Sequence, residues 1–271
     1  MLAQIKEKMR NGELMSAIKK TIRNRFLVFW NSIRYANAFY FLDAERVLTR
    51  RYIKKLKKAL KNLKSYSNYS LHPSIRLNEK SLVYSLGIFR DVSFDLAIAN
   101  QTGCQVHLFD PTPVTKEFMV QYANHALLHY HPIGIWTENT QLTFYQGKED
   151  TSSTVFNEDG VKKSVHFVAD CKTIPTVMKE NAHTAIDVLK MDIEGAALPV
   201  CKHIFEHGIF PKQIVGEFER PLKSMPQVKE FLKSIDELVN QMTVLGYSVY
   251  SLHRSQAYYS VELLAVKDSD S

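Results

Sequence analysis

The chain has 271 residues, 45% of them apolar and 23% charged, which is typical of a globular protein with a sizeable core. Its ten glycines and nine prolines exclude a collagen-like or low-complexity chain, and its three scattered cysteines exclude a disulfide framework and favour a reducing compartment. The net charge of +7 is uneven: residues 1–64 contain 17 Lys and Arg against 4 Asp and Glu, a charge of +13, so the rest of the chain carries −6.

The N-terminal region shows no secretory signal. Its most apolar stretch, residues 26–42, carries seven aromatic side chains but is interrupted by Asn31, Arg34 and Asn37. It is therefore too short and too polar to predict a membrane-spanning helix, and we expect a helix that packs on the main domain or lies in a membrane interface. Residues 44–64 predict a second, strongly basic helix with a narrow apolar stripe, which suits either packing by one face or contact with an anionic surface.

The Ser-, Asn- and Pro-containing segment 65–74 breaks this helical pattern. We therefore predict two parts: a basic, aromatic-containing helical extension over residues 1–74, and a main domain over residues 75–271.

The main domain alternates predicted strands with predicted helices. Apolar runs predict strands at 81–87, 104–110, 126–136, 141–147, 164–171, 185–195, 213–219, 247–252 and 261–267. Helices are predicted at 91–100, 115–124, 174–181, 196–207 and 226–245. This order predicts an α/β fold: a Rossmann-like, doubly wound, mostly parallel sheet that ends in an antiparallel hairpin. Ligands of such sheets bind beyond the carboxyl ends of the strands.

Two residues at predicted strand ends suit an adenosine-bearing ligand. Gly87 ends the first strand, where a glycine lets a ligand approach the backbone closely. Asp110 ends the second strand, where a carboxylate can accept hydrogen bonds from ribose hydroxyls, although it could also cap the turn at Pro111. A dinucleotide fingerprint needs three spaced glycines, so the single Gly87 favours S-adenosylmethionine over NAD.

A third strand end gives the most specific signal. The stretch from Ile186 to Ala197 reads IDVLKMDIEGAA and resembles the pattern I-D-x-L-K-x-D-x-E-G-A-E of the FkbM-type methyltransferases, within the class I S-adenosylmethionine-dependent superfamily. Ala197 replaces the last glutamate of that pattern. Four further segments resemble the family in the same order, over about residues 75–267: VYSLG (83–87) followed by DVSFD (91–95), FDPTP (109–113), HPIG (131–134) and GEFE (216–219).

The resemblance implies a methyltransferase that uses S-adenosylmethionine. We predict that its cofactor is bound by Tyr84, Ser85, Gly87, Asp91, Asp110, Pro111, Asp170 and Asp192. Asp192 and Glu194 are the predicted catalytic residues: one could take the proton of an acceptor hydroxyl. Alternatively, Asp192 positions the methionine end of the cofactor and Glu194 caps the next helix. No metal is predicted, although Glu217 and Glu219 with Asp192 would offer oxygen ligands to Mg²⁺. His131 is expected to be structural.

The expected activity is methyl transfer to a hydroxyl of a small molecule or glycan, in the cytoplasm, with contact to a membrane surface through the basic extension as an additional hypothesis. A nucleic-acid methyltransferase is a less favoured alternative, because the Asn/Asp-Pro-Pro-aromatic turn of enzymes that methylate base amino groups is absent after Asp192. A catalytically degenerate binding or scaffold protein is the third interpretation, and failure to bind the cofactor would favour it.

Overall fold

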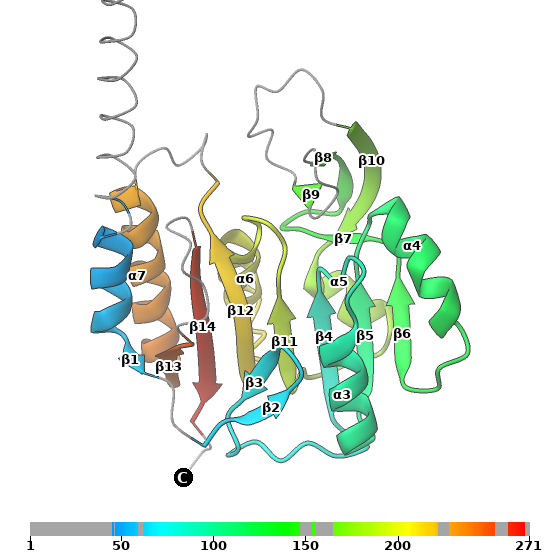
Figure 1. The fold of residues 1–271 in the computed structure, drawn as a ribbon, viewed down its shortest axis with the longest axis horizontal. Helices are drawn as coiled ribbons and strands as arrows, with labels where there is room; N and C mark the ends of the chain where they lie inside the picture. Colours follow the sequence, from blue (N-terminus) through cyan, green and yellow to red (C-terminus); the bar gives the residue numbers. More distant parts are fainter. Residues whose placement is uncertain are drawn as a thin grey trace, which may run out of the picture. The chain divides into compact units, whose positions relative to one another are not determined.

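The computed structural model describes residues 45, 47–58, 62–146, 153–154, 165–221, 228–252 and 260–268, and the aromatic stretch at 26–42 lies outside this set. Residues Leu48–Ser271 form one compact unit. Strands and helices alternate along it (Figure 1). Among the described helices, none combines the length and the apolar character needed to cross a bilayer.

An eight-stranded sheet forms the centre of the unit, in the spatial order β1-β13-β14-β12-β11-β4-β5-β6. Its main strands are β4 (Leu82–Leu86), β5 (Gln105–Phe109), β6 (Leu128–His131), β11 (Val188–Met191), β12 (Gln213–Glu219), β13 (Tyr247–Ser251) and β14 (Ser260–Lys267). Strands β6, β5, β4, β11 and β12 run parallel, whereas β14 pairs antiparallel with both β12 and β13. The predicted Rossmann-like sheet with a C-terminal antiparallel hairpin is confirmed.

Helices cover both faces of this sheet because successive strand residues point to opposite sides. Tyr84 and Leu86 belong to the core under α5 (Ile174–Glu180), α6 (Ala197–Glu206) and α7 (Val228–Val244). Val83 belongs to the core under α3 (Ser93–Thr102) on the other face (Figure 1). The connection from β5 to β6 contains α4 (Pro113–Met119) and the short 3₁₀ helix η1 (Val120–Tyr122).

A second sheet, which the sequence reading did not separate from the first, has the order β7-β10-β8-β9. Its strands are β7 (Gly134–Ile135), β8 (Thr140–Gln146), β9 (Ser153–Thr154) and β10 (Val165–Lys172). The predicted strands at 141–147 and 164–171 are therefore present, but they pair with each other in antiparallel register rather than joining the main sheet. Figure 1 shows this sheet beyond the carboxyl ends of β4, β5 and β6.

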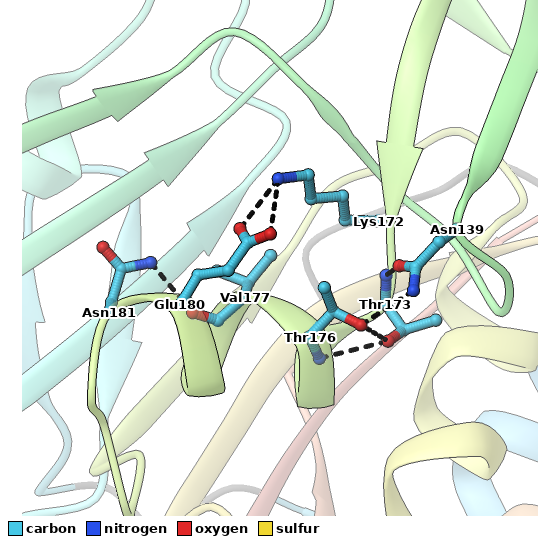
Figure 2. A network of polar contacts seen from close by, with 7 residues as sticks. All are labelled: Asn139, Lys172, Thr173, Thr176, Val177, Glu180 and Asn181. Atoms are coloured by element: carbon cyan, nitrogen blue, oxygen red, sulfur yellow. Dashed lines mark hydrogen bonds and ion pairs between the residues drawn. The ribbon is translucent and has the colours of Figure 1, made fainter.

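A polar network fixes the junction between the second sheet and α5 (Figure 2). Thr173 is the N-cap of α5, and its hydroxyl accepts a hydrogen bond from the Thr176 N–H at 3.2 Å. Asn139 accepts from the Thr173 N–H and donates to the Thr176 hydroxyl, both at 2.9 Å. The ion pair between Lys172 and Glu180, at 2.7 Å, is substantially exposed and adds little. The cap therefore ties the loop before β8 to the start of α5.

The predicted basic helix at 44–64 is wrong in its second half. The helix ends at residue 55, and β1 (Lys57–Lys58) then pairs in parallel with β13 at the edge of the main sheet. Helical propensity is a weak preference, and pairing with an open sheet edge overrides it here.

Residues predicted to be an irregular boundary segment form a β-hairpin. Its strands are β2 (Lys64–Tyr66) and β3 (Tyr69–Leu71), and the side chains of Tyr66 and Leu71 are buried. The predicted domain boundary at residue 74 thus falls inside the compact unit that begins at Leu48.

Four histidines pack their rings together on the α5 side of the sheet. The centroid of the buried His107 ring lies 4.7 Å from that of His129, 5.1 Å from that of His131 and 4.5 Å from that of His183. His107 Nδ1 lies 2.9 Å from His131 Nε2, and the Tyr84 hydroxyl lies 2.8 Å from His183 Nδ1. Burial, together with the neighbouring imidazoles, lowers the pKa of His107 to about 3 and that of His131 to about 4.

We expect acid to destabilise the fold through this cluster. A histidine in the unfolded chain has a pKa of about 6.5, so below that pH the unfolded state takes up protons that the folded cluster does not accept. The stability contributed by neutral His107 is complete above pH 6.5 and decreases as the pH falls toward about 4. Urea unfolding from pH 7.5 to 4.5 measures this dependence. The dependence of unfolding free energy on pH should be shallower for His107→Gln than for wild type. His166→Gln, at an exposed position on β10, is the control and should leave that dependence unchanged. Equal slopes for wild type and His107→Gln would contradict the explanation.

Candidate functional site

A cavity of about 370 Å³ opens at the carboxyl edge of the main sheet, between the loops that follow β4, β5 and β11. The strand order reverses at β4, so this is the edge at which ligands of such sheets bind. Gly134, Ile135 and Phe144 of the second sheet form part of the wall. The predicted site residues that line the cavity are Gly87, Asp91, Asp110, Pro111, Asp192 and Glu194.

Gly87 brings the loops after β4 and β11 into direct backbone contact. Its φ of 74° lies in the left-handed region, and a Cβ placed there would come within 1.7 Å of the Asp192 carbonyl oxygen. The Gly87 N–H donates to the Phe109 carbonyl, and the Asp192 N–H donates to the Leu86 carbonyl, both at 2.9 Å. Three neighbouring strands are therefore linked at this point, and only glycine fits there.

Asp110 supports the loop after β4. Its Oδ2 accepts hydrogen bonds from the N–H groups of Ile88 at 3.0 Å and Phe89 at 2.8 Å. Its Oδ1 accepts from the Thr112 N–H at 2.9 Å and the Thr112 hydroxyl at 2.6 Å. The buried carboxylate thus uses all of its usual acceptor positions within the protein: the bonds to Thr112 are the turn cap offered as an alternative by the sequence, and the bonds to the loop after β4 were not predicted.

The Thr112 hydroxyl has an alternative acceptor. Thr115 Oγ1 lies 2.5 Å from it, and Thr115 donates its own proton to the Phe89 carbonyl at 2.9 Å. Thr112 has one hydroxyl proton for two acceptors, Asp110 and Thr115. If this proton turns toward Thr115, one acceptor position on Asp110 becomes available.

Lys190 lies under the same loop. Its side chain is buried, and its ammonium donates to the Gly87 carbonyl. Asp95, on α3, is also buried; burial raises the pKa of its carboxyl, and the positive charge of Lys190 opposes that shift. The sequence reading gave neither residue a role in the site.

Asp192 follows β11 and is hydrogen-bonded by a residue of the β2–β3 hairpin, which the sequence did not place near the site. Its Oδ2 accepts a hydrogen bond from the Tyr69 hydroxyl at 3.0 Å, although 123 residues separate the two in the chain. Its Oδ1 has no hydrogen-bond partner within the part of the chain that the structure describes, and the residue lines the cavity. One carboxylate oxygen is therefore left for a ligand.

Glu194 also lines the cavity, and its backbone φ is 45°. It does not cap α6, whose N-cap is Ala196 without a side-chain hydrogen bond. Burial and the nearby Glu194 carboxylate raise the pKa of Glu219 to about 10. This raised pKa favours one proton shared between the two carboxyl groups.

The described residues contain no group of three or more His, Cys, Asp or Glu side chains arranged to hold a metal ion.

Three predicted cofactor residues do not line the cavity. Tyr84 and Ser85 are fully buried within β4. Asp170 lies on β10 of the second sheet, where it accepts a hydrogen bond from the Gln141 amide at 2.9 Å. His131 stacks on Phe109 with ring centroids 4.6 Å apart, a packing contact of the kind expected for it.

Sequence reasoning missed Tyr69, which lies in the segment interpreted as a boundary. A signal was present: Tyr66 and Tyr69 flank the polar pair Ser67-Asn68, and such a pair between strand-forming residues is typical of a tight hairpin.

Comparison with known proteins assigns this architecture. The model of the methyltransferase FkbM domain matches residues 62–249. The chain belongs to the FkbM methyltransferase family. The family resemblance inferred from the motifs is confirmed, and the protein is a methyltransferase whose cofactor is S-adenosylmethionine.

Solved structures with similar folds have low sequence identity to this FkbM protein. A fibrillarin pre-rRNA processing protein of Methanococcus jannaschii is 12% identical, with a TM-score of 0.44 over 78% of this chain and 72% of that one. The Podospora anserina methyltransferase PaMTH1, bound to S-adenosylhomocysteine, is 10% identical, with a TM-score of 0.39 over 69% and 72%. No curated protein sequence matches significantly, so the family model alone carries the assignment.

The cavity residues fit this cofactor. Gly87 and Asp192 both line the cavity, and the Asp192 carboxylate offers an acceptor to a positively charged group. Phe89, Phe109 and Phe144 supply apolar walls suited to a flat base.

Gly87→Ala is expected to destabilise the fold by about 3 kcal/mol, because the new methyl group would force the loops after β4 and β11 apart. Gly208→Ala is the matched control: its φ of 70° is equally unfavourable for alanine, but no heavy atom lies within 4 Å of the added Cβ. That substitution should cost only about 1 kcal/mol. Denaturant unfolding measures both, and equal losses would contradict the close contact at Gly87.

Proposed function

We propose that the protein transfers the methyl group of S-adenosylmethionine to a hydroxyl of a small molecule or glycan. The observation that carries the proposal is Asp192, which lines the cavity and has only its Oδ2 in a hydrogen bond with a described residue. A carboxylate in that position can orient an acceptor hydroxyl and take its proton.

Cofactor binding is proposed for the loop after β4, with Gly87 and Asp91, and for Asp110 and Pro111 after β5. When bound, S-adenosylmethionine supplies an electrophilic methyl group on a positively charged sulfur. Rotation of the Thr112 hydroxyl toward Thr115 would let Asp110 accept a ribose hydroxyl without losing its two bonds to the loop. The negative charges of Asp91 and Asp192 suit the positively charged sulfonium and amino groups.

Methyl transfer to oxygen needs alignment more than strong acid–base chemistry. The apolar wall of Phe109, Ile135 and Phe144 limits water at the cavity. Glu194 also lines the cavity, so a hydroxyl-rich acceptor would meet two carboxyl groups there.

Titration of the purified chain with S-adenosylhomocysteine tests the cofactor part. We expect micromolar affinity, a loss of at least tenfold in Asp110→Ala, and wild-type or slightly tighter binding in the control Thr112→Val, which removes the competing hydroxyl donor. The absence of binding to wild type would refute the proposal and favour a scaffold role.

Transfer of labelled methyl groups to glycans and small alcohols, with RNA as the competing acceptor, tests the reaction class. Asp192→Asn should lower hydroxyl methylation about a hundredfold or more, because it removes the proposed base. Methylation of RNA alone, with binding that weakens steeply as salt rises, would support the nucleic-acid alternative.

The charge of +13 over residues 1–64 supports a second proposal, that the protein acts from the cytoplasm against an anionic membrane surface. The full chain should sediment with phosphatidylcholine vesicles only when phosphatidylserine is added. Lys54→Gln/Lys55→Gln, at exposed positions of the helix over residues 47–55, should weaken this binding. Equal binding to neutral and anionic vesicles would contradict the electrostatic explanation.

A further inference from the structure

The hairpin β2–β3 is anchored firmly on the α3 face of the main sheet. Tyr66 and Leu71 are both 2% exposed. The rings of Tyr66 and Tyr69 meet Phe94 of α3 edge-on, with centroid distances of 6.4 and 5.3 Å. This packing gives the hairpin a fixed position relative to the sheet.

Hydrogen bonds hold the carboxyl end of the hairpin as well. The His72 N–H donates to Gln213 Oε1 at 2.8 Å, and the Gln213 amide donates back to the His72 carbonyl at 2.9 Å. Gln213 is fully buried at the start of β12, so this reciprocal pair ties the hairpin to the centre of the sheet.

The turn of the hairpin reaches two cavity carboxylates. Asn68 donates from Nδ2 to Asp91 Oδ2 at 3.2 Å, and Tyr69 donates from its hydroxyl to Asp192 Oδ2 at 3.0 Å. These carboxylates come from the loops after β4 and β11, which meet at Gly87. Two adjacent hairpin residues therefore hold acids from both sides of the cavity.

Electrostatics fix the direction of the second bond. Burial raises the pKa of the Tyr69 hydroxyl, and the charge of Asp192 raises it further. The hydroxyl keeps its proton and acts as a donor at all working pH values. The ammonium of Lys190 lies 5.3 Å from the centroid of the Tyr69 ring, and this cation–π contact also helps to fix the position of the ring.

We propose that the hairpin β2–β3 is a positioning element of the methyltransferase site, in which Tyr69 orients the Asp192 carboxylate and Asn68 orients that of Asp91. The inference rests on the proposed cofactor site. With Oδ2 occupied by Tyr69, the Asp192 carboxylate presents Oδ1 to the cavity. The hairpin lies before the predicted domain start at residue 75, so the site depends on residues outside that predicted domain.

The test is a double-mutant cycle on the affinity for S-adenosylhomocysteine, measured by calorimetry on the full chain. Tyr69→Phe keeps the ring between Phe94 and Lys190 but removes the bond to Asp192. We expect it to weaken binding about five- to tenfold. In an Asp192→Ala background, which removes both acceptor oxygens, the same change should have no further effect, because the two residues act through one contact.

Tyr66→Phe is the matched control. It removes a hydroxyl from the same hairpin and the same Phe94 contact, but from a side chain that makes no bond to a cavity carboxylate. It should bind within twofold of wild type. Asn68→Ala should weaken binding about two- to fivefold through Asp91.

The outcomes separate the inference from the function on which it rests. Loss of affinity in Tyr69→Phe that disappears in the Asp192→Ala background supports positioning. The positioning role is refuted if Tyr69→Phe binds with wild-type affinity. It is also refuted if the effects of the two substitutions on affinity multiply independently. Neither result would contradict the proposed methyltransferase function. Failure of wild type to bind S-adenosylhomocysteine refutes the cofactor site itself. Thermal unfolding of each variant, expected within about 2 °C of wild type, excludes a loss of folding as the cause.

Discussion

The backbone contact between Gly87 and Asp192 is the constraint on which the site depends. Parallel strands β4 and β11 are neighbours, and the chain leaves both at the same edge. A side chain at position 87 would separate the two loops, so the absence of a Cβ there determines how near the Asp192 carboxylate lies to the loop after β4. Asp110 then supports that loop from β5 through the N–H groups of Ile88 and Phe89.

A layer of buried polar groups lies behind this contact, on the face covered by α3 and the hairpin. Burying a single ammonium in an apolar core is unfavourable unless hydrogen bonds and opposite charges replace its water. Lys190 meets that requirement with the Gly87 carbonyl, the nearby Asp95 and the face of Tyr69. The same ammonium therefore supports the loop after β4 and the tyrosine that reaches Asp192, so the cavity is stabilised from within the core.

Much of the fold follows from local patterns, because strands buried on both sides read as apolar runs and helices end at glycines such as Gly103 and Gly208. Local patterns do not determine which strand pairs with which. Strand β10 is recognisable as a strand from its sequence, but only its antiparallel register with β8 assigns it to a second sheet, which takes Asp170 away from the cavity. The contact of Tyr69 with Asp192 spans 123 residues and is set by packing on Phe94, which no local pattern encodes. Gly87, Asp110 and Asp192 could be placed at one edge because parallel strands share the direction of their ends.

The position of β14 has a consequence for the order in which the chain is made. This strand is synthesised after every other strand of the main sheet, yet it lies between β12 and β13. While a ribosome is still adding residues before 260, β12 therefore has an open edge, and an open edge invites pairing with other chains. Glu217 and Glu219, near the end of β12, would be ionised in that incomplete, hydrated state and would discourage such pairing. The same glutamates become partly buried, with raised pKa values, only when the last strand closes the sheet.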